Sequence, residues 1–164
     1  MYVEFQQLPA HARVWIYQAN RAFNEQESTF VQSYLKQAVQ DWNAHGVPLA
    51  GSFQIRYNQI IVIAVDEHHH AASGCSIDAS TGWFKDLAFQ MGMDFFDRSV
   101  ALVQEDNLIL FPLLGVKQVI NEGHINADSL IAIPQVKDLG DYRANWPAKA
   151  KDSWLKKYFV AASV

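Results

Sequence analysis

Apolar residues recur three and four positions apart between residues 30 and 42, and this spacing predicts an amphipathic helix. Asn24 is a favourable N-cap, and Glu27 three residues later completes a capping-box pattern. We expect Gly46 to end the helix in a left-handed cap and Pro48 to prevent its continuation. The apolar stripe consists of Phe30, Val31, Tyr34, Leu35, Ala38, Val39 and Trp42.

Alternating and continuous apolar patterns predict three strands around this helix. The first runs from about Ala12 to Gln18, and its bulky residues on both faces favour a position inside the sheet rather than at its edge. Residues 49–57 alternate between apolar and smaller or polar positions, and Asn58-Gln59 supplies a turn. Residues 60–65 then return as a strand that is apolar on both faces.

The second half of the pattern begins with a polar loop over residues 66–77. A second helix is predicted from Asp78 or Ser80 to Met91, and a hairpin joins residues 99–103 to residues 108–111. The order β-α-β-β-α-β predicts an α+β fold with an antiparallel sheet, either ferredoxin-like or another arrangement of the same elements.

After Pro112 the pattern becomes helical, apart from a short apolar stretch at residues 128–133 that predicts a sixth strand. Pro147 suits the first turn of a last helix. We therefore expect a single domain over residues 1–164, with a core over about 1–112 and a C-terminal helical extension that wraps around it over about 113–164.

Composition narrows the class of protein. Hydrophobic residues make up 50% of the 164 residues, which excludes a disordered chain. With 13 Lys and Arg against 17 Asp and Glu the net charge is −4, so we expect no nucleic-acid partner. One cysteine excludes an intramolecular disulfide and indicates a reducing compartment. No signal-peptide pattern and no membrane-length apolar run is seen, so we expect a cytoplasmic protein without a membrane partner.

Most candidate chemistry lies between Asp66 and Asp78. Three carboxylates, three imidazoles and a thiol offer every ligand type that zinc accepts. The spacing is wrong, because the adjacent His68, His69 and His70 cannot all point at one ion. We therefore predict no metal site, and no cofactor is implied.

Cys75 is a candidate nucleophile within this segment. It stands just before the predicted helix, where free backbone amides and the helix dipole stabilise a thiolate. His68 or His70 from the preceding turn is the candidate base. The alternative is that the cysteine is a small buried hydrophobic residue with no chemical role.

The same loop also suits an anion. Gly74 permits close backbone approach, and Ser73 and Ser76 add hydroxyl groups at a helix start, with Asp78 beside them. The structural alternative is that these side chains only cap the helix. Arg56, on the polar face of its strand, is a further candidate for a ligand carboxylate.

Four segments together resemble a family of short bacterial proteins whose members are often labelled "ABC transporter ATPase". They are Val14–Arg21, Phe53–Gln59, Ser73–Ser80 and Phe95–Arg98. The resemblance covers most of the chain and implies no established catalytic residue. The label conflicts with the sequence, since neither a phosphate-binding Gly-x-x-x-x-Gly-Lys-Ser/Thr loop nor a Leu-Ser-Gly-Gly-Gln motif is present.

These patterns favour a protein that is not an ATPase and acts by binding a small anionic ligand or another protein. The alternative is an enzyme that depends on Cys75. A homodimer formed through an exposed strand or the C-terminal helix is compatible with either function.

Overall fold

The computed structural model describes residues 1–68 and 70–160, which form an α+β structure with antiparallel sheets. Its strands are β1 (Arg13–Gln18), β2 (Asn43–Ala44), β3 (Val47–Pro48), β4 (Ala50–Arg56), β5 (Ile60–Asp66), β6 (Val100–Gln104), β7 (Asn107–Phe111), β8 (Leu130–Ile131) and β9 (Ala148–Lys149). Its α-helices are α1 (Glu25–Gln40), α2 (Gly74–Met91), α3 (Val116–Asn121), α4 (Leu139–Asn145) and α5 (Lys157–Val160). Short 3-10 helices are η1 (Phe5–Gln7), η2 (Ala150–Asp152) and η3 (Trp154–Lys156).

The first sheet has the order β1-β5-β4 with antiparallel pairing throughout. β5 is central, and its residues from Ile60 to Val65 are all buried, as the unbroken apolar run predicts. The prediction that the first strand lies inside the sheet is wrong, because β1 is an edge strand. Its residues are bulky on both faces because both faces are covered, although one edge has no neighbouring strand.

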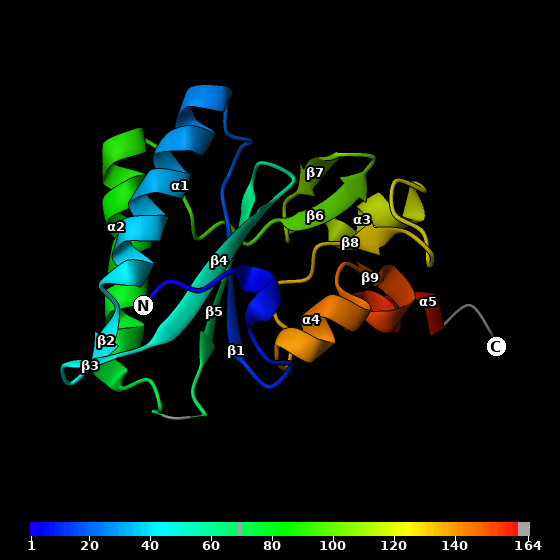
Figure 1. Cartoon of the computed structure of the whole chain (residues 1–164). Helices are drawn as coiled ribbons and strands as arrows, with labels where there is room; N and C mark the ends of the chain where they lie inside the picture. The colour runs from blue at the N-terminus through cyan, green and yellow to red at the C-terminus, as the bar shows by residue number, and fades with distance from the viewer. Residues whose placement is uncertain (69, 161–164) are drawn as a thin grey trace.

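Helices α1 and α2 lie side by side on one face of this sheet (Figure 1). The core between them and the sheet contains Leu35 and Phe84, neither of which is accessible to solvent. The ring of Tyr17 on β1 stacks on that of Phe84 at a centroid distance of 3.8 Å. This stacked pair fixes α2 against the edge strand.

The capping box at the start of α1 is confirmed. The Asn24 side chain accepts a hydrogen bond from the Glu27 amide, and the Glu27 carboxylate accepts one from the Asn24 amide. Hydrogen bonds from Arg21, and from the Asn24 amide, lower the pKa of Glu27 to about 2. The predicted end at Gly46 is wrong: α1 ends at Gln40, and Gly46, with φ of 82°, lies in the turn between β2 and β3.

The second helix starts earlier than predicted. Ser73 is the N-cap of α2, and its hydroxyl accepts a hydrogen bond from the Ser76 amide, so the helix begins at Gly74. At the other end α2 stops at Met91, as predicted, and Gly92, with φ of 60°, forms a left-handed cap.

The second sheet has the order β7-β6-β8-β9. A ferredoxin-like sheet would place the fourth strand beside β1, whereas β6 lies in this separate sheet. A bridge between Gln18 and Phe96 joins the chain before β6 to the edge of β1. The predicted sixth strand is present but short, as β8.

Helix α4, together with η1 near the N-terminus, covers the second face of the first sheet (Figure 1). The sequence does not predict α4, and Pro147 follows it instead of opening a last helix; β9, η2, η3 and α5 come after it. Leu139 on α4 is fully buried in this second core. The Tyr142 hydroxyl donates a hydrogen bond to Gln54 Oε1 on β4 at 2.6 Å.

None of the helices in the described ranges combines the length and apolar character needed to cross a bilayer.

Candidate functional site

A cavity of about 550 Å³ lies beside the first turn of α2 and contains Cys75 in its wall. We name it the Cys75 cavity. Its lining residues come from α1, the β2–β3 hairpin and α2: Tyr34, Gln37, Ala38, Asp41, Trp42, Asn43, His45, Ser73, Cys75, Ser76, Ala79 and Trp83. The cavity is therefore built where two helix ends and a hairpin meet.

Cys75 is exposed, and its thiol forms no disulfide. This finding contradicts the alternative in which the cysteine packs in a closed apolar core. Gly74 and Cys75 occupy the first turn of α2, where backbone amides have no partner within the helix. Ser73 accepts from the Ser76 amide, so its hydroxyl has the capping role that the sequence predicts.

Ser76 and Trp42 hold the cavity together. The buried Ser76 hydroxyl donates a hydrogen bond to the carbonyl oxygen of Asn43 at 2.7 Å. The Trp42 indole Nε1–H donates one to the carbonyl oxygen of Ser76 at 2.9 Å. These bonds connect the start of α2 to the hairpin, so the first turn of α2 and the indole of Trp42 are fixed relative to one another.

Aromatic rings form one wall of the cavity. The rings of Trp42 and Trp83 meet edge to face with a centroid distance of 5.1 Å and an interplanar angle of 72°. Tyr34 adds a third ring, and its hydroxyl donates a hydrogen bond to Asp86 at 2.7 Å. A flat apolar group can rest against such a wall.

Apart from Cys75 and Tyr34, the cavity has two ionisable side chains. The imidazole at the cavity is that of His45, an exposed residue with φ of 51° in the β2–β3 turn. The carboxylate at the cavity is that of Asp41. Asp41 accepts a hydrogen bond from Gln37 at 2.9 Å. Lys and Arg are absent from the lining residues, so the site suits a singly charged group better than a polyphosphate.

Sequence reasoning missed His45. The predicted helix extended through residue 45, which concealed the turn in which this histidine stands. The signal that can find it is the sequence His45-Gly46-Val47-Pro48, which combines a turn-forming glycine with a proline.

Several predicted site residues lie elsewhere. The lining residues of the Cys75 cavity do not include Gly74, His68, His70 or Asp78. The His68 ring lies 5.6 Å from that of His11, measured between centroids, and its amide donates a hydrogen bond to Asp66. His69, named with them as a metal ligand candidate, lies outside the described residues.

Arg56 lies away from Cys75, with the C-terminal elements. Its guanidinium donates a hydrogen bond to the Tyr142 hydroxyl at 3.0 Å and lies 5.1 Å from the centre of the Trp146 ring. Burial raises the pKa of Tyr142, and the hydrogen bond from Arg56 opposes that rise. These contacts give Arg56 a structural partner.

Within residues 1–68 and 70–160, no three side chains of His, Cys, Asp or Glu come together in a way that could hold a metal ion.

In comparisons with known proteins, the chain matches no protein-family model, no curated protein and no solved structure.

Proposed function

We propose that this protein binds a small ligand with a flat apolar body and a single acidic group in the Cys75 cavity. The observation that carries the proposal is the meeting of an aromatic wall and a helix N-terminus in one cavity. Trp42 and Trp83 supply apolar surface for the body of the ligand. The amide of Cys75, which lines the cavity, and the amide of Gly74, one residue earlier in the same first turn of α2, supply donors and a positive dipole end for the acidic group.

The single charge follows from the surroundings of the helix start. Asp41 contributes a negative charge to the cavity, and the lining contains no Lys or Arg to offset it. A dianion would meet this repulsion with only amides and His45 to stabilise it. A monocarboxylate needs one pair of donors, which the first turn of α2 provides.

The exposed free thiol supports a reducing location, and we propose the cytoplasm. The order β1-β5-β4 with both helices on one face supports a ferredoxin-like core in which the fourth strand has moved to the second sheet.

Benzoate tests the binding site, with benzyl alcohol as the uncharged comparison. In ¹H–¹⁵N spectra at pH 7 we expect benzoate, at concentrations up to about 10 mM, to shift the amide signals of Gly74 and Cys75, because these amides receive the carboxylate. Benzyl alcohol is expected to shift signals near Trp83 and to leave these two amides in place.

A cavity-filling variant provides the control. Ala79 is exposed and lines the cavity, so Ala79→Phe is expected to weaken benzoate binding by roughly tenfold or more without unfolding the chain. Ala144→Phe places the same side chain at an exposed position on α4 and is expected to leave binding unchanged. Shifts confined to other parts of the molecule, or equal shifts with both variants, contradict the proposal.

A second candidate function, a reaction that uses Cys75 as nucleophile, is favoured by the presence of His45 in the same cavity. The base is then His45, in place of His68 or His70. An imidazole near the thiol assists its deprotonation, so we expect His45→Ala to slow alkylation of Cys75 by iodoacetamide at pH 7 by about tenfold.

His124→Ala is the matched control, because His124 is an exposed histidine on the other half of the molecule beside Glu122. Equal alkylation rates in the His45→Ala and His124→Ala proteins remove the catalytic candidate and leave ligand binding as the function of the cavity.

A further inference from the structure

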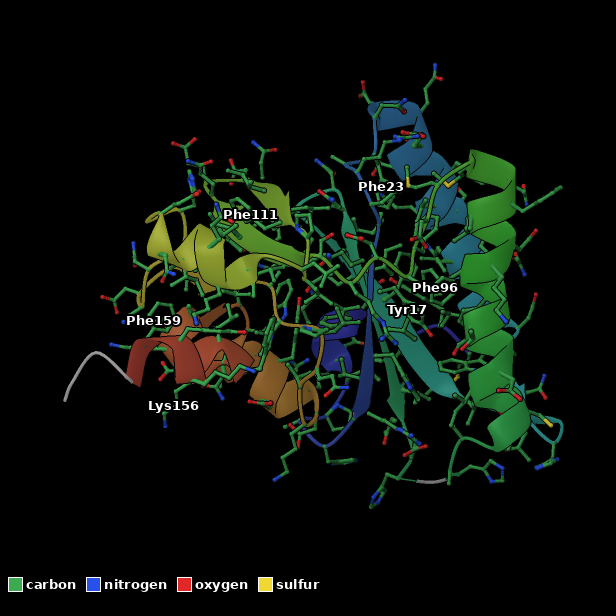
Figure 2. The ribbon with its side chains drawn as sticks, turned by 180° about the vertical axis from the view of Figure 1, so that it is seen from behind. Tyr17, Phe23, Phe96, Phe111, Lys156 and Phe159 are labelled. Carbon is green, nitrogen blue, oxygen red and sulfur yellow. The ribbon has the colours of Figure 1, made fainter. Side chains whose placement is uncertain are left out.

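A second cavity, of about 460 Å³, lies between the two sheets, on the edge of β1. We name it the intersheet cleft. It is lined by Ile16, Tyr17, Gln18, Phe95, Phe96, Asp97, Arg98, Ser99, Val100, Ala101, Leu113, Ile131, Ala132, Pro134, Gln135 and Trp154. Figure 2 shows Tyr17 and Phe96 beside one another between α2 and the second sheet, and the centroids of their rings are 5.9 Å apart. None of these residues belongs to the Cys75 cavity.

The backbone of β1 presents hydrogen-bonding groups to the intersheet cleft. The Ala19 amide donates to Gln59 at the β5 side, so odd-numbered residues of β1 face β5 and even-numbered ones face outward. The outward carbonyls at the two ends are occupied: Ala12 accepts from the Leu139 amide, and Gln18 accepts from the Asp97 amide. Between them, the outward amides and carbonyls of Val14 and Ile16 make no hydrogen bond to any other part of the described chain.

The gap is a short piece of sheet edge with both ends closed. The chain before β6 pairs with β1 at Gln18 and then leaves at Ser99, and the start of α4 closes the other end at Ala12. The amide and the carbonyl of Ile16 point to the same side of β1. A residue of another extended chain can therefore bond to both, with its own carbonyl accepting from the Ile16 amide and its own amide donating to the Ile16 carbonyl.

Apolar side chains surround the opening. Phe96, Leu113 and Trp154 line the intersheet cleft and are 42%, 46% and 43% exposed. These three side chains are partly exposed beside a concave surface. They therefore offer a contact site for a large apolar side chain of a partner.

Charge distinguishes the chemistry of the partner. Asp97 accepts hydrogen bonds from Gln18 Nε2 at 3.1 Å and from the Ser99 hydroxyl at 3.1 Å, so its carboxylate is already satisfied. Arg98 is exposed, lines the cleft and takes part in none of the ion pairs found in the described part of the chain. A group of negative charge is therefore the complement of the cleft.

We propose that the intersheet cleft binds an extended acidic peptide segment of a partner protein, which adds to the edge of β1 as a short strand. The peptide backbone pairs with Ile16, a large apolar side chain rests among Phe96, Leu113 and Trp154, and an acidic side chain pairs with Arg98. The backbone hydrogen bonds at the edge of β1 supply affinity that depends little on the sequence of the peptide. The apolar side chains and Arg98 determine which peptide sequences bind.

The test uses the peptide acetyl-Glu-Val-Phe-Val-Glu-amide and measures hydrogen exchange of the full chain. The Ile16 amide faces the cleft and is expected to gain protection of roughly tenfold or more at saturating peptide. The Trp15 amide faces β5 and serves as an internal control whose protection is expected to stay constant.

Two matched controls separate strand addition from adhesion to an apolar surface. The same peptide with N-methyl groups on both valines keeps its side chains and loses backbone donors, so it is expected to give no protection at Ile16. Gln135→Trp fills the cleft from an exposed position and is expected to abolish the effect, whereas Gln26→Trp, at an exposed position on α1, leaves it intact.

The charge is tested with Arg98→Glu, which changes an exposed side chain and is expected to weaken peptide binding by roughly tenfold. Binding without protection of Ile16, equal binding of the N-methylated peptide, or no binding up to about 1 mM overturns the proposal. A benzoate response at Gly74 in the same protein is independent of these outcomes, because the two cavities share no lining residue.

Discussion

Replacement of Phe84 by alanine is expected to lower the free energy of unfolding by about 3–5 kcal/mol. Phe84 has no solvent-accessible surface, and its ring stacks on that of Tyr17 and approaches that of Phe95 at 5.8 Å. Its removal leaves a cavity between α2 and the edge strand of the first sheet. Chemical denaturation followed by circular dichroism measures the change.

Phe89 provides the matched control on the same helix, because its side chain is 89% exposed. Phe89→Ala is expected to change the free energy of unfolding by less than about 0.5 kcal/mol. Similar losses in the two variants would contradict the packing of α2 on the sheet through Phe84.

Local patterns predicted the elements that depend on neighbours in sequence. The capping box at Asn24, the β4–β5 hairpin and the end of α2 at Met91 are all present as predicted, since each needs only a few adjacent residues. The position of β1 at an edge did not follow from its sequence. The spacing and size of the apolar side chains along a strand indicate whether its two faces are covered. They carry no information about whether another strand pairs with its edge.

The C-terminal third was the least predictable part. Residues 139–145 form α4 although their sequence has few apolar residues, and the helix is stabilised by packing of Leu139 and Tyr142 on the first sheet. Such stabilisation comes from tertiary contacts, which a pattern of neighbouring residues does not record.

The candidate site was predicted in part. The sequence identified the loop at Ser73–Ser76 because caps and glycine are local signals, and the structure places Ser73, Cys75 and Ser76 at one cavity. It did not identify Tyr34, Trp42 or His45 as part of the site, since these residues come from α1 and the segment that follows it, more than 25 residues earlier in the chain. His68 and His70 were chosen by proximity in sequence, which does not determine proximity in space.

The first sheet and the C-terminal segment share a core, and this arrangement predicts that they unfold together. Leu139 is fully buried among residues of both parts, and its amide donates a hydrogen bond to the carbonyl of Ala12 at 2.9 Å. Leu139→Ala is expected to lower the free energy of unfolding by about 2–5 kcal/mol. Leu114→Ala, at a leucine that is 93% exposed, is the same substitution without burial and is expected to change it by less than about 0.5 kcal/mol.

Hydrogen exchange decides whether the loss is shared. In the Leu139→Ala protein the amides of Ile61 and Ile63 on β5 are expected to lose as much protection as those of α4, because one cooperative unit opens as a whole. Protection of β5 that stays at the wild-type level while α4 exchanges freely would show that the C-terminal segment opens by itself. The core around Leu139 would then hold the segment in place without contributing to the stability of the sheet, and the chain would have two units of stability where its packing indicates one.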